Sequence, residues 1–239
     1  MSEREKQASL NALLSLIVRR AVCGLTNKNY NNLFLSVISE LDKKGWSYSN
    51  LRAHILATAT ASGRFPQDEE FQEAILSKPL YNTLGPARVR TILSEIEIAK
   101  RGNKQEDKSL PATLTVEHVL PQTWRTHWPI TDEPRPTEAD FSQAAYAVLE
   151  DETGLGRIVR RNRLRHALGN LTLVTQSFNS AVSNLAFDVK RKELEEQSIL
   201  MLNKGFTKLN TWNEDAITER GRNLFGYMRE LWAIPKPLE

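Results

Sequence analysis

Cysteine is almost absent from this chain: Cys23 is the only one among 239 residues. A single cysteine excludes a disulfide bond within the chain and any zinc knuckle of the Cys-x-x-Cys type. We therefore expect no structural zinc, and any metal must be held by oxygen and imidazole ligands.

Long apolar stretches are absent as well. No run approaches the roughly 18 apolar residues that a membrane-spanning helix needs, and the first residues lack the pattern of a signal peptide. With 40% hydrophobic and 26% charged residues, the composition is typical of a globular protein. These features predict a cytoplasmic protein that does not contact a membrane.

The net charge of +3 is small, but the basic residues are concentrated in one segment. Residues 157–192 contain eight basic residues and one acidic residue, and acidic residues flank the segment on both sides. A local basic surface is typical of proteins that bind nucleic acid. A solvated helix face would explain the same pattern, so charge alone does not decide.

The first hundred residues have the period of amphipathic helices. Apolar residues recur at helical spacing over 10–18 and 30–41, and Gly24 and Gly45 follow as stop signals. No strand pattern interrupts this region, which predicts a helical bundle. Further helices are expected over 49–61, 68–77 and 86–100.

The polar segment 101–110 is the predicted boundary between a supporting or docking bundle, residues 1–108, and a second domain, residues 109–239. In the second domain, β-preferring residues predict strands over 113–116 and 171–175. A helix is expected from Asn179 to about residue 202. The order strand, strand, helix predicts a ββα unit in a mainly α, α+β protein.

The two strands are separated by a long segment. Residues 129–156 contain three prolines and two glycines around one short helix, expected over 137–150, so we interpret about 122–160 as an insertion. Near the C-terminus, an amphipathic helix is expected with Asn213 as a plausible N-cap, and its apolar face consists of Ile217, Leu224, Met228 and Leu231.

Three short motifs contain the residue types that phosphodiester hydrolysis requires. They are Glu117-His118-Val-Leu-Pro, Gly-Asn170-Leu-Thr-Leu and Asn179. Hydrolysis needs a base that activates water, a cation that stabilises the leaving oxygen, and a group that orients the base. An imidazole suits the first role, and carboxylate and amide oxygens suit a hard cation such as Mg²⁺.

These motifs resemble those of the HNH, or His-Me finger, endonucleases. In that family the second metal ligand lies nine positions after the central asparagine, which is the spacing from Asn170 to Asn179. The resemblance implies that His118 is the general base, Glu117 and Asn179 are metal ligands, and Asn170 orients the base. Neighbours in a regular strand face opposite ways, so Glu117 and His118 share one site only if the strand ends or bulges there.

Over nearly its whole length the chain resembles the C-terminal region of GmrSD-type modification-dependent restriction endonucleases. The segments that carry this resemblance are Val-Arg-Arg-Ala-Val-Cys-Gly at 18–24, Arg-Phe-Pro-Gln-Asp-Glu-Glu-Phe at 64–71, the three motifs, and a Trp-rich tail over 212–232. The resemblance implies a role in restriction and phage defence with DNA as the substrate. It also implies a nucleotide-hydrolysing, DNA-sensing domain as partner, either N-terminal or separate.

Two departures from the HNH pattern affect the expected metal. The loop between His118 and Asn170 is far longer than the minimal one, and the last position is Asn179 rather than histidine. Asparagine in that place favours Mg²⁺ or Mn²⁺ over zinc. Asn179 would also suit a helix cap, and Asn184 is a rival ligand with a poorer spacing.

Basic residues near the motifs are candidates for contact with nucleic acid: Arg125, Arg163, Arg165, His166, Lys190 and Arg191. Trp124 and Trp128 follow the histidine motif and could stack on bases. Core packing is the favoured interpretation of both, because large aromatic side chains dominate buried area.

The sequence therefore predicts a Mg²⁺-dependent DNA endonuclease or nickase. One site per chain cuts one strand, and a homodimer would supply a second site. Two alternatives stay open: a non-cleaving nucleic-acid-binding or docking module with a degenerate HNH site, and a ribonuclease.

Overall fold

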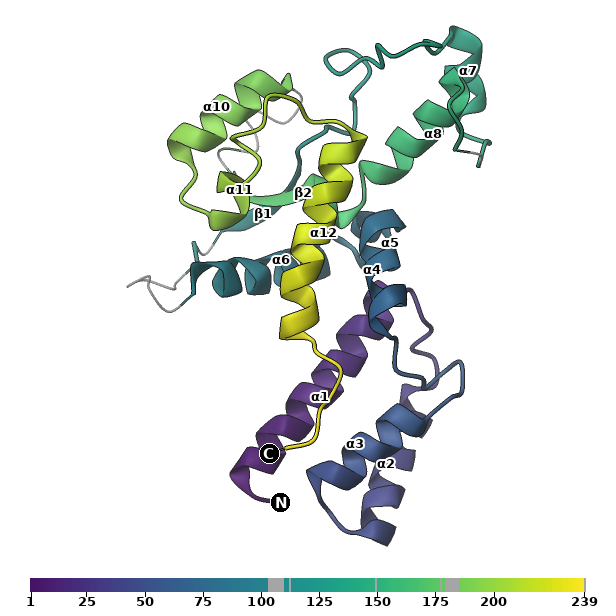
Figure 1. The fold of residues 1–239 in the computed structure, drawn as a ribbon, viewed down its shortest axis with the longest axis vertical. Helices are drawn as coiled ribbons and strands as arrows, with labels where there is room; N and C mark the ends of the chain where they lie inside the picture. Colours follow the sequence, from purple (N-terminus) through teal and green to yellow (C-terminus); the bar gives the residue numbers. More distant parts are fainter. Residues whose placement is uncertain (103–109, 112, 149, 177, 179–184, 239) are drawn as a thin grey trace. The chain divides into compact units, whose positions relative to one another are not determined.

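The structure, a computed structural model, describes residues 1–102, 110–111, 113–148, 150–176, 178 and 185–238 (Figure 1). The chain divides into two compact units: Met1–Ala74 with Phe225–Glu239, and Ile75–Leu224. The predicted domain boundary at 108/109 does not coincide with this division. Within the described residues, no helix is both long enough and apolar enough to cross a membrane.

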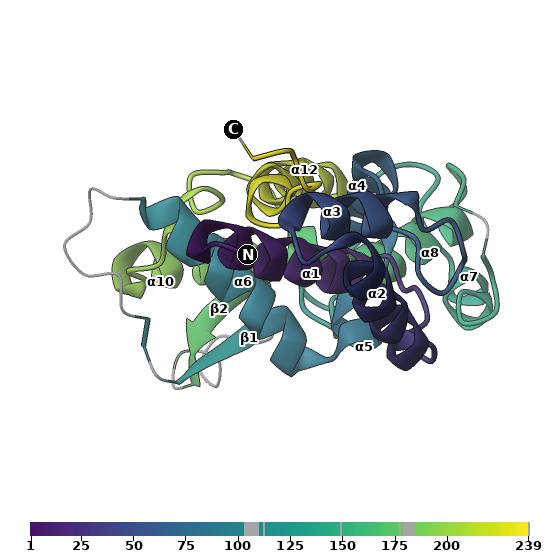
Figure 2. The same cartoon turned by 90° about the horizontal axis from the view of Figure 1, so that it is seen from below.

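The first unit contains the helices α1 (Glu3–Val22), α2 (Tyr30–Lys44) and α3 (Tyr48–Ala57). Figures 1 and 2 show α2 and α3 side by side. Gly24 and Gly45 follow α1 and α2 with φ of 67° and 97°, the left-handed backbone that favours glycine, so both predicted stop signals are confirmed. The core of this unit consists of Ala12, Leu16, Leu33, Val37, Leu41, Tyr48, Leu51, Ile55 and Phe65.

The second unit is built on a two-stranded antiparallel sheet of β1 (Leu114–His118) and β2 (Leu171–Thr175). His118 pairs with Leu171, and the amide of Val119 donates to the carbonyl of Asn170 (3.0 Å) just beyond the last pair. Helix α6 (Pro86–Arg101) contacts both strands (Figure 1).

After β2 come α10 (Phe187–Gln197) and α11 (Met201–Lys204), and α11 contacts β2. The predicted ββα order and the mainly helical α+β class are thereby confirmed. The helix expected from Asn179 to about 202 is divided in two after Gln197, and residues 179–184 lie outside the described residues.

The long connection between the strands contains two helices, and one of them was not expected. The predicted helix over 137–150 is shorter, as α7 (Glu138–Gln143), and it contacts α8 (Gly154–Leu164), which the sequence analysis missed. Two glycines in its first turn lower the helical propensity of this segment. Thr153 nevertheless caps α8, because its hydroxyl accepts from the amide of Gly156 (3.1 Å).

The remaining helices are α4 (Asp68–Ser77), α5 (Leu80–Leu84), the 3₁₀ turn η1 (Leu168–Asn170) and α12 (Glu214–Leu231). Helices α4 and α6 agree with the predicted ranges, whereas α3 ends earlier than expected and α5 was not predicted. Helix α12 buries the predicted Ile217, Leu224 and Met228, but Leu231 is 38% exposed. The predicted cap of α12 is confirmed, since the side chain of Asn213 accepts from the amide of Ala216 (3.0 Å).

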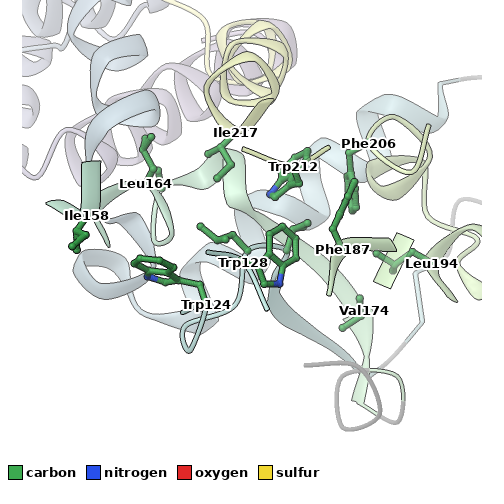
Figure 3. Packing of buried hydrophobic residues seen from close by; sticks show 13 residues of the cluster. Trp124, Trp128, Ile158, Leu164, Val174, Phe187, Leu194, Phe206, Trp212 and Ile217 are labelled. Atoms are coloured by element: carbon green, nitrogen blue, oxygen red, sulfur yellow. The ribbon is translucent and has the colours of Figure 1, made fainter. Parts of the chain in front are cut away.

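The core of the second unit includes both tryptophans that follow the histidine motif. Trp124 and Trp128 are 4% and 8% exposed, which confirms core packing as their role. Figure 3 shows the rings of Trp128, Phe187 and Trp212 close together, with centroids 5.7 Å apart for the first pair and 5.9 Å for the second. The cluster also contains Val119, Leu120, Ile158, Leu164, Ala167, Val174, Leu194, Phe206 and Ile217.

Gly169 lies where helix α12 approaches the turn before β2. A Cβ atom at this position would lie 2.1 Å from the carbonyl oxygen of Ile217 and 3.0 Å from the amide of Gly221. Arg220 stabilises the same turn, because its Nη1 donates to the backbone carbonyls of Gly169 and Leu171 at 2.7 Å each. Only glycine allows this approach.

Gly169→Ala should therefore destabilise the protein by about 1–3 kcal/mol, because helix α12 must shift to accommodate the methyl group. Gly205→Ala is the matched control, since nothing lies within 4 Å of its Cβ position and its backbone is right-handed helical, and it should leave stability unchanged or raise it by up to about 1 kcal/mol. Urea unfolding of both variants measures the difference. Equal stability of the two would contradict the close approach of α12.

Candidate active site

His118 is the last residue of β1 and is 5% exposed. Its ring and the Tyr81 ring from α5 form a T-shaped pair with centroids 4.5 Å apart, and its Nε2 lies 3.1 Å from Nδ1 of His166. Tyr81 also stacks on His166, and its amide donates to the carbonyl of His166 (3.1 Å). Two segments that are distant in sequence from β1 thus enclose the imidazole that the sequence analysis assigned as the base.

Asn170 is fully buried and hydrogen-bonded at both ends of its amide. Its Oδ1 accepts from the amide of Leu120 (2.8 Å) and from Nε1 of Trp212 (2.9 Å). Its Nδ2 donates to the carbonyls of Leu120 (2.9 Å) and Arg165 (2.8 Å). Asn170 therefore ties the turn after His118 to the segment before His166. It lies in η1, directly before β2, rather than on the strand.

Arg165 and His166 follow helix α8 and continue the polar contacts of His118. Nε of Arg165 donates to Nε2 of His166 (3.1 Å), and its Nη1 donates to the carbonyl of Gln122 (2.9 Å). His166 is 7% exposed, so its ring belongs to the buried cluster around His118. The predicted direct contact of His166 with nucleic acid does not fit this burial.

Glu117 faces a different set of residues from its neighbour His118. Its Oε1 accepts from Nζ of Lys190 in α10 (2.6 Å), and the same ammonium group donates to the backbone carbonyl of His118 (2.8 Å). Both residues lie within β1, paired in regular register, so the strand neither ends nor bulges between them. The condition under which Glu117 and His118 would share one metal site is not met.

Glu117 as placed does not fit a divalent cation. The cation would have to share a 7% exposed carboxylate with the ammonium group of Lys190, which has the same sign of charge. Within the described residues, no group of three or more His, Cys, Asp and Glu side chains could hold a metal ion. The predicted ligand Asn179 and its rival Asn184 lie outside the described residues.

Burial controls the protonation of the site. It lowers the pKa of His118 to about 3, with smaller contributions from the nearby His166, Lys190 and Arg165. Burial, followed by Arg165, lowers the pKa of His166 to about 4. Both imidazoles are therefore uncharged at neutral pH. Burial also raises the pKa of Glu117, and the Lys190 ammonium opposes that rise.

The remaining predicted nucleic-acid contacts are spread over the second unit. Arg125 pairs with Glu138, and its side chain is 52% exposed. Arg163 pairs with Glu150 and donates to the carbonyl of Ser77 (2.9 Å), whereas Arg191 donates to the carbonyl of Leu209 (3.3 Å). A phosphate would have to replace the carboxylate partners of Arg125 and Arg163.

The prediction that Lys190 contacts nucleic acid is contradicted by its position, since it is 1% exposed. Its sequence neighbours Arg191 and Lys192 suggested a basic surface, but the side chain of Lys190 points from α10 to β1. Sequence reasoning also missed Tyr81, because the short helix α5 has too few turns to show a period.

One comparison with known proteins gives a match. The family model of the GmrSD restriction endonucleases, C-terminal domain, matches residues 65–226. No curated protein and no solved structure matches the chain. The family match covers most of the chain and includes both histidines of the site and Asn170, so the chain belongs to this family. Membership points to an endonuclease role in restriction, in which DNA is the substrate.

The Glu117–Lys190 pair yields a stability prediction. Lys190→Met should destabilise the protein by about 3–5 kcal/mol, because it leaves a buried carboxylate without its partner. The double variant Glu117→Gln/Lys190→Met should recover much of that loss. Lys192→Met, which removes an exposed charge from the same helix, is the control. Chemical denaturation distinguishes these variants, and a Lys190→Met chain as stable as the control would show that the pair is not formed.

The low pKa of His118 predicts a pH dependence of stability. An imidazole in the unfolded chain titrates near 6.5, whereas His118 in the folded chain titrates at about 3. Between these values the unfolded chain binds more protons, so the free energy of unfolding falls as the pH is lowered through this window. His118→Phe should therefore lose stability less steeply than the wild type between about pH 6.5 and pH 4.

The exposed His127→Phe is the matched control for this measurement and should retain the wild-type slope. Thermal or urea unfolding at several pH values gives the slopes. A His118→Phe variant with the same slope as the wild type would show that this imidazole is not shielded from solvent.

Proposed function

We propose that this member of the GmrSD restriction endonuclease family is a metal-dependent DNA endonuclease or nicking module of the HNH type, with His118 as its general base. The main support is the contact between the two central motifs. The side chain of Asn170 accepts from the backbone amide of Leu120 and donates to the backbone carbonyl of Leu120, so the turn after His118 is fixed. This is the orienting role that the resemblance implies for Asn170.

The ring nitrogens of His118 have different surroundings. Nε2 faces His166, whereas no residue in the described part of the chain hydrogen-bonds to Nδ1. Nδ1 is therefore the nitrogen that we assign to the attacking water. A neutral imidazole can accept a proton from water when its lone pair faces that water. The low pKa of His118 keeps the ring in its neutral form.

The requirement for Mg²⁺, with Mn²⁺ as a substitute, is proposed from the resemblance. Mg²⁺ prefers oxygen ligands and retains several waters, so few protein ligands suffice. Asn179 stays a proposed ligand, and Glu117 is withdrawn because Lys190 neutralises it. No catalytic step is assigned to the cation.

The proposed substrate and partner follow from the family. Phage or foreign DNA is the proposed target, and a nucleotide-hydrolysing, DNA-sensing domain is the proposed partner, either N-terminal to this region or on a separate chain. Cleavage of both strands would require a homodimer or two successive nicks, since one site of this kind cuts one strand.

One observation favours a second candidate, a nucleic-acid-binding module that does not cleave. The ion pair between Glu117 and Lys190 occupies the carboxylate that the HNH pattern assigns to metal. A degenerate site of this kind would bind DNA and leave it intact.

Plasmid cleavage separates the two candidates. Supercoiled DNA with Mg²⁺ or Mn²⁺ should become relaxed or linear, and EDTA should abolish the reaction. His118→Ala should reduce the rate by about 10²–10⁴-fold, because the base is lost. The exposed His127→Ala is the control and should cleave like the wild type.

If the chain binds DNA tightly but leaves the plasmid intact with both Mg²⁺ and Mn²⁺, it is the non-cleaving module. Equal cleavage by the wild type and His118→Ala would exclude His118 as the base. Parallel reactions with DNA and RNA of the same sequence should show cleavage of DNA, and preferential cleavage of RNA would identify a ribonuclease.

A further inference from the structure

A series of hydrogen bonds from Arg165 ends at His118. Nε of Arg165 donates to Nε2 of His166 (3.1 Å), and Nδ1 of His166 lies 3.1 Å from Nε2 of His118. The two imidazole rings are nearly perpendicular, at 87°, with centroids 5.1 Å apart. All three side chains belong to the same compact unit.

The first donor in this series fixes the direction of the others. A guanidinium group can only donate, so Nε2 of His166 must accept. A neutral imidazole has one proton, which in His166 must then lie on Nδ1. That proton is donated to Nε2 of His118, and the proton of His118 consequently lies on its own Nδ1. The low pKa values of both rings agree with neutral imidazoles.

This direction prevents His118 from acting as a base at Nδ1. The lone pair of His118 points to His166, and Nδ1, the nitrogen assigned to the attacking water, presents a proton. The opposite direction would place a proton on Nε2 of His166, opposite the N–H of Arg165. Two donors would then face each other, so the active tautomer requires that Arg165 leaves His166.

We propose that Arg165 is a substrate-operated switch, whose guanidinium group holds His118 in the inactive tautomer until a DNA phosphate draws it away. This inference rests on the proposed function and adds a control of the same site. Arg165 is partly exposed, and its other bond is to the carbonyl of the exposed Gln122. A phosphate carries a negative charge, so its hydrogen bonds with the guanidinium group include an attraction between opposite charges that a neutral imidazole or a carbonyl does not offer.

The proton movements of the switch balance. After Arg165 leaves, Nε2 of His166 takes one proton from solvent, and the proton on Nδ1 of His166 passes to Nε2 of His118. Nδ1 of His118 releases its proton to water, so one proton enters and one leaves. Both rings stay neutral, and the lone pair on Nδ1 of His118 becomes available to the attacking water.

Arg165 is distinguished from the other candidate arginines by its partners. Arg125 and Arg163 pair with Glu138 and Glu150, so a phosphate must compete with a carboxylate there. The two bonds described for Arg165 go to neutral groups. Arg165 is also the arginine whose position determines the tautomer of His118, so it couples the arrival of an anion to the state of the base.

Nitrogen NMR of the full chain with ¹⁵N-labelled histidine tests the switch, because the shifts of the two ring nitrogens show which one is protonated. The chain has four histidines, and single replacements assign their signals. In the free wild type, His118 and His166 should both be protonated at Nδ1. Arg165→Met should change both to predominantly Nε2-protonated rings. Arg125→Met is the matched control and should leave the wild-type pattern.

A second arm uses a short DNA duplex with EDTA, so that binding is observed without cleavage. Saturating duplex should change His118 of the wild type to the Nε2-protonated form. Protonation of His118 at Nε2 in the free wild type, or a His118 signal that neither Arg165→Met nor the duplex changes, would overturn the proposal. If Arg165→Met does not fold, the duplex titration of the wild type decides alone.

The NMR readout is independent of activity. A chain that leaves plasmid intact but shows the tautomer change would contradict the proposed endonuclease and retain the switch. A chain that cleaves plasmid while His118 keeps one tautomer throughout would retain the endonuclease and contradict the switch.

Discussion

The site depends on the side-chain amide of Asn170. This fully buried group forms four hydrogen bonds, two to the backbone of Leu120, one to the carbonyl of Arg165 and one from Trp212. Each such bond contributes about 1 kcal/mol net, and a buried partner left unsatisfied costs about 1–3 kcal/mol. Because the bonds join the turns after His118 and before His166, one residue fixes the separation of the two imidazoles.

The sheet then separates the Glu117–Lys190 ion pair from the two imidazoles of the site. Consecutive residues of β1 face opposite ways, so Glu117 meets Lys190 while His118 meets Tyr81 and His166. The carboxylate is neutralised by a cation of the chain itself, and the imidazole is kept uncharged by burial. A base that is neutral and rigidly held needs only the correct tautomer to accept a proton, which gives the neighbouring Arg165 its importance.

Much of the fold and part of the site could be predicted from the sequence. The helical periods, the glycine stops, both strands and the cap by Asn213 depend on local chemistry, and the structure confirms them. The contact of Asn170 with the turn after His118 followed from the family motifs. Helix α8 was not predicted because its two glycines lower the helical propensity, and α5 is too short to show a helical period of apolar residues. Lys190 was predicted to lie on the surface because a charged side chain is expected to be exposed unless it has a buried partner. Its partner, Glu117, lies far away in sequence and could not be recognised.

Amide hydrogen exchange at Leu120, in the wild type and in Asn170→Ala without metal or DNA, tests most directly whether Asn170 holds the site together. Our account predicts strong protection of this amide in the wild type and exchange at least about tenfold faster in the variant, since about 1.4 kcal/mol or more of local stability is lost. The amide of Leu16, in the core of the other unit, should exchange at the same rate in both. An amide of Leu120 that exchanges equally in both proteins would contradict the account.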